Sequence, residues 1–347
     1  MASTPLRDRR TAIPVIALTG YLGAGKTTLL NHVLRTPHAR IGVVVNDFGD
    51  VNVDAGLISG QIDEPASIAG GCICCLPDDG ELGAALTKLA NPKLRLDAIV
   101  VEASGLADPA TLARILGFSE VEGIRDGGVV DVVDAARHFD TVDCGGVAPA
   151  RYGAATLVVV NKLDQLPVEE RDAAVRRVEG RVRERNSRAQ VVGVTDGRID
   201  PALLYDLAAA TDETGQLSFR DAIFEESTGA HHHHIHADAV TVAGAGDVDP
   251  DHLLDLLEDP PAGVYRMKGC VSVRHRGGAR PYVVNVVGPS VHIARGAASA
   301  RPPACLVAIG MHLDTRAVRA SMSAALQPAD SSPSAAATRR WQRAVRR

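Results

Sequence analysis

The chain has 347 residues, 46% of them apolar and only 3% aromatic, and 37 basic against 42 acidic residues give a net charge of -5. This length suggests two domains, with cores built from aliphatic residues as in buried parallel sheets. The weak charge gives no reason to expect nucleic acid or an anionic membrane as a partner. The sequence also has no apolar run of about 18 residues, the length that a helix needs to span a bilayer.

The opening stretch, Arg7 to Ala17, faintly resembles an export signal because basic residues precede apolar ones. Its apolar part is short and runs directly into a glycine-rich loop, so we interpret it as a first strand. The expected location is therefore the reducing cytoplasm.

Apolar runs alternate with helical stretches from residue 13 to about 208. The strand-like runs are mostly continuous, which is typical of a parallel sheet covered on both faces. They are Ile13 to Thr19, Ile41 to Val45, Ala98 to Val101, Val129 to Val133, Thr156 to Val160 and Val191 to Val194. The predicted helices are Lys26 to Leu34, Glu81 to Leu89, Pro109 to Leu116 and Val168 to Arg185. This pattern predicts a doubly wound α/β domain over residues 1–210, with its ligand at the carboxyl ends of the strands.

The composition changes after this domain. Residues 211–236 are polar and end in a histidine run, His231 to His236, so we predict a linker, with storage of a metal ion as an equally weighted alternative. The strand-like and helical segments of residues 237–326 predict a small α+β domain with mostly antiparallel strands. Residues 327–347 are rich in Ser, Ala and Pro and end in arginines, which predicts a disordered, solvated tail rather than a partner-binding segment.

A phosphate-binding loop follows the first strand. The spacing of glycines before Lys26 and Thr27 lets backbone N–H groups face phosphate oxygens at the start of a helix. Lys26 is expected to bridge the β and γ phosphates and the Thr27 hydroxyl to ligate Mg²⁺. The predicted nucleotide-binding residues here are Gly20, Gly23, Ala24, Gly25, Lys26, Thr27 and Thr28.

A base-selecting motif closes a later strand of the same sheet. Asn161, Lys162 and Asp164 stand in the pattern Asn-Lys-x-Asp. The Asp164 carboxylate can accept hydrogen bonds from the ring N–H and the exocyclic amino group of guanine, whereas adenine offers no matching pair of donors. The motif therefore predicts GTP rather than ATP.

Glu102 ends another strand and is followed by Ser104 and Gly105. An acidic group there can hold Mg²⁺ or orient the attacking water, while Ser104 and Gly105 approach the γ-phosphate. The stretch Asn46 to Asp54 is an acidic loop that we interpret as a switch ordered by Mg²⁺ and γ-phosphate.

Three of the six cysteines, Cys72, Cys74 and Cys75, lie in one short loop. Clustered thiols are typical of metal or redox sites, because adjacent cysteines do not easily meet disulfide geometry. Three thiolates without an obvious fourth ligand suggest an open site for Zn²⁺, Cu⁺ or Co²⁺. Redox-active thiols and buried structural cysteines remain as alternatives. The isolated Cys144, Cys270 and Cys305 are interpreted as ordinary free thiols.

The order of these motifs resembles the CobW branch of the CobW/HypB/UreG GTPases, and Tyr265-Arg266-Met267-Lys268-Gly269 resembles the opening of the CobW C-terminal domain. The resemblance implies a phosphate-loop GTPase domain and a GTP-driven metallochaperone whose Cys-x-Cys-Cys loop binds the ion. One residue departs from the pattern, because the family usually has Glu where this chain has Asp47, which leaves a metal-ligating role for Asp47 open.

We therefore expect a GTPase with Lys26 and Glu102 as catalytic residues, Thr27 and Glu102 as Mg²⁺ ligands, and zinc or cobalt as the transferred ion. The expected recipient is a client metalloprotein or a metal-inserting enzyme, and a nucleotide-dependent dimer is left open. The alternatives are an ATP- or GTP-dependent enzyme with incidental cysteines, and a redox-regulated switch.

Overall fold

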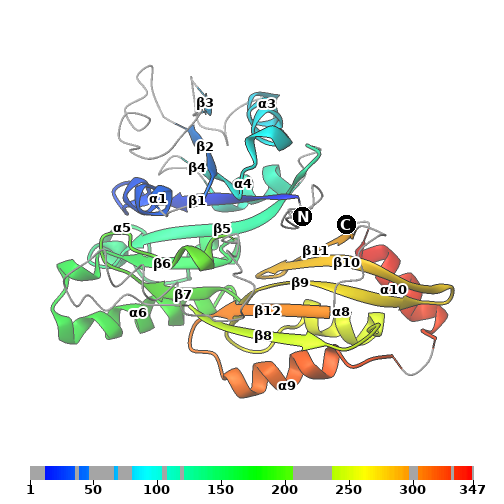
Figure 1. Ribbon diagram of the computed structural model, residues 1–347. Helices are drawn as coiled ribbons and strands as arrows, with labels where there is room; N and C mark the ends of the chain where they lie inside the picture. The colour runs from blue at the N-terminus through cyan, green and yellow to red at the C-terminus, as the bar shows by residue number, and fades with distance from the viewer. Residues whose placement is uncertain are drawn as a thin grey trace.

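The computed structural model describes residues 12–35, 39–46, 66–68, 80–103, 108–117, 121–205, 237–296, 304–329 and 332–345. They form two sheets side by side, each with helices packed on it (Figure 1). The first sheet has seven strands, all paired in parallel, in the order β3-β2-β4-β1-β5-β6-β7. Its strands are β1 (Ile13–Gly20), β2 (Ile41–Asn46), β3 (Ala66–Ile68), β4 (Ala98–Glu102), β5 (Ile124–Asp134), β6 (Leu157–Asn161) and β7 (Gln190–Gly193).

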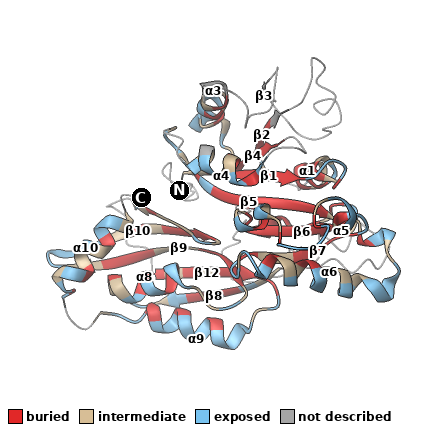
Figure 2. Cartoon of the chain, turned by 180° about the vertical axis from the view of Figure 1, so that it is seen from behind, coloured by how far each residue is buried: buried red, intermediate tan, exposed pale blue. Residues whose placement is uncertain are grey.

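Helices cover both faces of this sheet, which explains why its strands are continuous apolar runs rather than alternating ones. On one face, α1 (Lys26–Leu34) packs over β1, β5 and β6. The opposite face carries α3 (Gly80–Leu89), α4 (Pro109–Gly117) and α6 (Val168–Arg183). Figure 2 shows the resulting pattern, with buried strands in the middle and helices exposed on their outer sides. No helix in the described ranges is long and apolar enough to cross a bilayer.

The predicted doubly wound domain is confirmed, and α1 has the bounds that the sequence predicts. Two details of the sheet differ from the prediction. The short edge strand β3 was not predicted, and β5 begins at Ile124 rather than Val129. The start of β5 contains Gly127 and Gly128 at an irregularity in its pairing with β1, so its first residues lack the apolar run that would mark them as a strand.

The second sheet is antiparallel, in the order β11-β10-β9-β12-β8, and confirms the predicted α+β domain. Its strands are β8 (Asp238–Gly244), β9 (Val264–His275), β10 (Gly278–Val287), β11 (Ser290–Arg295) and β12 (Ala304–Gly310). One face packs against α8 (Pro250–Glu258), α9 (Thr315–Ala325) and α10 (Ala335–Ala344), with Leu253, Met322 and Trp341 fully buried between them. In the part of the chain that is described, no helix packs on the opposite face.

The expectation of a disordered tail after residue 327 is wrong for α10. Ser334 caps the helix through a 3.0 Å hydrogen bond from the Ala337 N–H to its side-chain oxygen. Ala337 and Trp341, four residues apart, form the buried stripe of the helix. Arg340 pairs with Asp255 and Glu258 of α8, each at 2.6 Å. The Ser- and Ala-rich composition concealed a capped amphipathic helix, because one tryptophan supplies most of its apolar surface.

The two domains share one hydrophobic core. Tyr265 and Val287 of the C-terminal domain belong to the cluster that also contains Leu157 and Val159 of β6. Tyr265 is 2% exposed, and its hydroxyl lies 3.2 Å from the Thr156 hydroxyl. Desolvation by burial raises the pKa of Tyr265, so the phenol stays protonated at neutral pH. The domains are therefore joined by buried side-chain contacts as well as by the connecting chain.

We predict that Trp341→Ala destabilises the protein by about 3–5 kcal/mol, because it empties a fully buried aromatic site. Urea unfolding followed by circular dichroism measures the loss. Arg343→Ala, on the exposed face of the same helix, serves as the control and should change stability by no more than about 0.5 kcal/mol. Equal stability of Trp341→Ala and the parent would show that α10 does not dock in solution.

Candidate functional site

A glycine-rich loop connects β1 to α1 at the carboxyl edge of the parallel sheet. Gly20, Gly23 and Gly25 have φ values of 148°, 78° and 99°, which L side chains rarely adopt. A side chain at Gly25 would also overlap the Asn161 amide nitrogen. Lys26 is 9% exposed, and its ammonium donates a 2.9 Å hydrogen bond to the Gly20 carbonyl, so the side chain folds back along the loop. This is the geometry of a phosphate-binding loop that leads into a helix N-terminus.

Glu102 lies beside this loop because β4 is the parallel neighbour of β1, with Glu102 in register with Leu18. Its carboxylate is 3% exposed and accepts a 3.0 Å hydrogen bond from the Thr27 hydroxyl. The contact joins residues 75 positions apart in sequence. The structure thus brings together an oxygen pair, one hydroxyl and one carboxylate, at the start of α1.

Asn161 ties the glycine-rich loop to the far side of the site. Its amide nitrogen donates to the Ala24 carbonyl at 3.0 Å, and its amide oxygen accepts from the Gly197 N–H at 2.9 Å. The side chain is 1% exposed, so both bonds are made away from water. One residue of β6 therefore sets the position of the loop from β1 and of the segment after β7.

The other two residues of the base-selecting motif differ in their surroundings. Lys162 has a φ of 62° and its ammonium lies 2.7 Å from a carboxylate oxygen of Asp134, at the end of β5. Asp164 lies in a single 3-10 turn, Leu163–Gln165, and its side chain is exposed. Asp164 is therefore accessible to a base, while Lys162 is held between β5 and β6.

A cavity of about 220 Å³ opens beside these residues. The glycine-rich loop from Tyr21 to Ala24 forms one side, and Asp134, Lys162 and the short helix α5 (His138–Thr141) form the other. It lies at the carboxyl ends of β1, β5 and β6, where the sequence predicts the ligand of an α/β sheet.

A buried polar network holds α5 in place behind this cavity. His138 contacts the Tyr152 hydroxyl, which in turn donates to Asp143 at 3.3 Å. Arg181 of α6 donates to both Asp143 oxygens at 2.9 and 2.7 Å. The hydrogen bond from Arg181 lowers the pKa of Asp143, and desolvation lowers the pKa of His138, so the carboxylate is charged and the imidazole neutral at pH 7.

Sequence reasoning missed the acidic residues at the end of β5. Asp134 accepts from the backbone N–H groups of Ala136 and Arg137 and pairs with Lys162. Asp131 is fully buried, accepts from the Thr19 hydroxyl at 3.0 Å and pairs with Arg151 at 2.6 Å. The available signal was an aspartate directly after an apolar run, the same signal that marks Asn161.

The structure brings the predicted nucleotide-site residues Gly20 to Thr28, Glu102, Asn161, Lys162 and Asp164 to one edge of the sheet. The remaining predicted positions lie outside the described residues: Asp47, Cys72, Cys74, Cys75, Ser104, Gly105 and His231 to His236. Within the described ranges, no group of three or more His, Cys, Asp or Glu residues could hold a metal ion.

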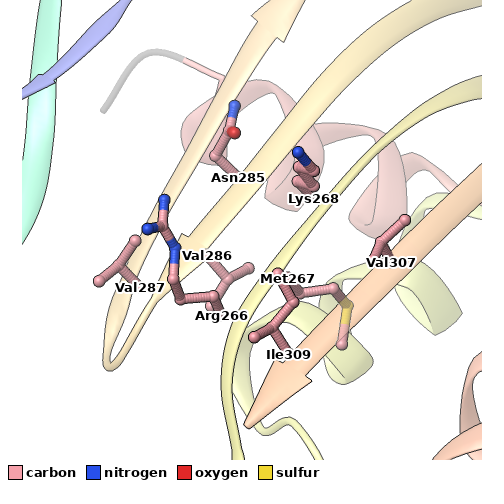
Figure 3. A pocket seen from close by; sticks show the side chains of 8 residues that line it. All are labelled: Arg266, Met267, Lys268, Asn285, Val286, Val287, Val307 and Ile309. Carbon is pink, nitrogen blue, oxygen red and sulfur yellow. The ribbon is translucent and has the colours of Figure 1, made fainter. Parts of the chain in front are cut away.

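A second, shallow hollow lies on the open face of the C-terminal sheet. Arg266, Lys268 and Asn285 and the apolar Val287 and Ile309 are among the side chains around it (Figure 3). It belongs to the other domain and has no glycine-rich loop, so the candidate nucleotide site is the cavity beside the phosphate-binding loop.

Comparison with known proteins finds matches to both domains. Residues 14–193 match the CobW/HypB/UreG nucleotide-binding domain, and residues 237–326 match the cobalamin synthesis protein cobW C-terminal domain. The zinc chaperone CobW of Sinorhizobium sp is 30% identical over 92% of this chain and 99% of its own length. The zinc chaperone YjiA of Escherichia coli K12 is 34% identical over 56% of this chain and 61% of its own length. The crystal structure of Zn(II)-bound YjiA GTPase from E. coli, at 23% identity, covers 90% of this chain and 98% of that chain with a TM-score of 0.41.

The fold and the site define a phosphate-loop nucleotide-binding protein. The two domain matches and the full-length relative then place it more narrowly, and the chain belongs to the CobW/HypB/UreG family. Its enzymatic activity is that of a GTPase.

We predict that Asn161→Ala weakens GTP binding about 10- to 100-fold, because it leaves the Ala24 carbonyl and the Gly197 N–H without their buried partner. Binding of a fluorescent GTP analogue measures the effect. Asn186→Ala is the matched control, since Asn186 also bonds backbone groups of this domain, Ala155 and Arg188, but not the site. Similar GTP affinity in Asn161→Ala and the control would contradict the assigned role.

Proposed function

We propose that the protein is a GTP-hydrolysing metallochaperone that binds a transition metal ion at Cys72, Cys74 and Cys75 and releases it under nucleotide control. The observation that carries the proposal is the place of β3. This strand pairs in parallel with β2 and ends at Ile68, at the carboxyl edge that also holds Glu102 and the phosphate-binding loop. Cys72 follows four residues later, and four residues span at most about 14 Å.

This placement gives a short physical route between the nucleotide and the ion. The segment between β2 and β4 contains the proposed switch and the cysteines, and it leaves the end of β2 at the edge of the sheet that holds Glu102. A change at the γ-phosphate can therefore alter the geometry of the thiolates through a continuous stretch of chain. Binding and hydrolysis would hold and release the ion in turn.

The residues around Lys26 fit magnesium as the resident cofactor. Mg²⁺ prefers oxygen ligands, and the Thr27 hydroxyl and Glu102 carboxylate, already 3.0 Å apart, supply two. We assign them as the residues that hold the ion, which would neutralise phosphate charge when bound with GTP. Lys26 holds the phosphates, and Glu102 also orients the attacking water. Ser104 and Gly105 complete the γ-phosphate side.

Zinc is the metal that we propose as the cargo. Thiolate ligands suit Zn²⁺, and the CobW and YjiA relatives are named zinc chaperones. The recipient would be a client metalloprotein or a metal-inserting enzyme. We expect the protein to act in the cytoplasm, where reducing conditions keep the thiols free.

The guanine assignment predicts a change of base specificity in Asp164→Asn. The carboxylate accepts two hydrogen bonds from guanine, whereas an amide turns one acceptor into a donor that suits the 2-oxo group of xanthine. GTP affinity should fall by about 100-fold or more while xanthosine triphosphate affinity rises.

Competition binding with GTP, xanthosine triphosphate and ATP measures this change. Asp172→Asn, an exposed carboxylate on α6, is the matched control and should bind like the parent. Unaltered nucleotide preference in Asp164→Asn would instead favour the alternative, an ATP-dependent enzyme.

The metal assignment predicts that Cys74→Ser lowers zinc affinity without changing GTP binding. The loss should be at least about 10-fold, since even outer-sphere partners of a metal contribute that much. Competition with a chromophoric chelator in the presence of GTP and Mg²⁺ measures it. Cys144→Ser is the control, because it removes an exposed free thiol that lies about 70 residues from Cys74 in the sequence. Equal zinc affinity in Cys74→Ser and parent would remove the chaperone assignment.

A further inference from the structure

Two cysteines face each other on the C-terminal sheet. Cys270 of β9 and Cys305 of β12 are direct partners in the antiparallel register, although 34 residues lie between them in sequence. Directly opposite residues in antiparallel strands point to the same face, so the two thiols are neighbours on one surface. Nothing in the sequence marks this pairing, because each cysteine is isolated in its own strand.

The thiols lie on the face that the helices do not cover. Side chains alternate along a strand, and Met267 and Val271 of β9 and Leu306 of β12 belong to the core under α8, α9 and α10. Cys270 and Cys305 therefore point away from the helices, and both are half-buried. A small reagent in solution can reach them.

The backbone geometry suits a covalent bond between them. Opposite residues of antiparallel strands have Cα atoms about 4.5–5.5 Å apart, within the range of about 4.4–6.8 Å found in disulfides. The strands approach closely at this point, since a Cβ atom at Gly269 would overlap the Cys305 carbonyl. A side chain at 269 would push the two strands apart.

We propose that Cys270 and Cys305 form a redox-active dithiol, which closes to a cross-strand disulfide in reaction with low-molecular-weight disulfides. The thiolate of one cysteine attacks the small disulfide and releases one thiol, and the second cysteine then displaces the other thiol from the mixed disulfide. The protein loses two electrons and two protons, and the small disulfide becomes two thiols.

Disulfide chemistry fits this pair better than metal binding. Burial and the neighbouring Cys305 raise the pKa of Cys270, so its thiol is less ionised at neutral pH than an ordinary cysteine, which weakens metal binding and slows disulfide exchange alike. No third ligand completes a metal cluster within the described ranges. The same shift makes exchange slow at neutral pH and faster in mildly alkaline buffer.

The bond would link strands that also carry the domain interface. Tyr265 lies on β9 and Ile309 on β12, and both belong to the core shared with the GTPase domain. The disulfide would stabilise the C-terminal sheet next to this contact, at a distance from the nucleotide site at the end of β1.

The test incubates the full-length protein with oxidised glutathione in mildly alkaline buffer, blocks remaining thiols, digests it with trypsin and identifies the peptides by mass spectrometry. Cleavage after Lys268 and Arg274 isolates Cys270 on a peptide with no other cysteine. We expect that peptide to be linked to the one containing Cys305, with reversal by dithiothreitol. The melting temperature of the oxidised protein should rise by roughly 5–10 °C.

Cys270→Ser and Cys305→Ser should each abolish the link and the rise in melting temperature, whereas Cys144→Ser should keep both. A Cys72→Ser, Cys74→Ser, Cys75→Ser triple variant should also keep both, which separates this pair from the proposed metal loop. Cys270 and Cys305 that stay free, or that carry separate glutathione adducts, would overturn the proposal. So would an unchanged melting temperature after oxidation.

Discussion

The site depends on the two buried hydrogen bonds of the Asn161 side chain. They join the glycine-rich loop after β1 to the segment after β7, and β6 supplies the bridging residue. Gly25 has to be a glycine partly because this amide occupies the space of its side chain. The residue that opens the predicted base-selecting motif thus also shapes the glycine-rich loop, so one buried contact joins the two predicted parts of the nucleotide site.

The second organising feature is the core that both domains share. Tyr265 from β9 belongs to the same cluster as Leu157 and Val159 of β6, and its hydroxyl meets Thr156 just before that strand. One hydrophobic cluster therefore joins the C-terminal domain to the strand that carries Asn161. A shift of β6 would be felt in both domains, because close-packed cores deform little.

The sequence predicted elements best where local chemistry determines them. The bounds of α1 follow from the phosphate-loop pattern and were predicted as observed. The start of β5 was missed because Gly127 and Gly128 interrupt its apolar run, and α10 was missed because most of its apolar surface comes from Trp341. The pairing of Asn161 with Ala24 joins residues 137 positions apart, and that of Lys162 with Asp134 depends on strand order. Such contacts depend on the order of the strands in the sheet, and a local sequence pattern does not show that order. The metal loop lies outside the described residues and stays a prediction.

In the proposed function, the nucleotide state controls the affinity for the metal ion. The most direct measurement is the zinc affinity of one protein preparation with Mg²⁺ and a non-hydrolysable GTP analogue, compared with Mg²⁺ and GDP. We expect the two zinc affinities to differ by about 5- to 150-fold, the range of ordinary coupling between two sites, and zinc to change the relative affinity for the two nucleotides by the same factor. The same zinc affinity in both nucleotide states would show that GTP does not control the metal ion.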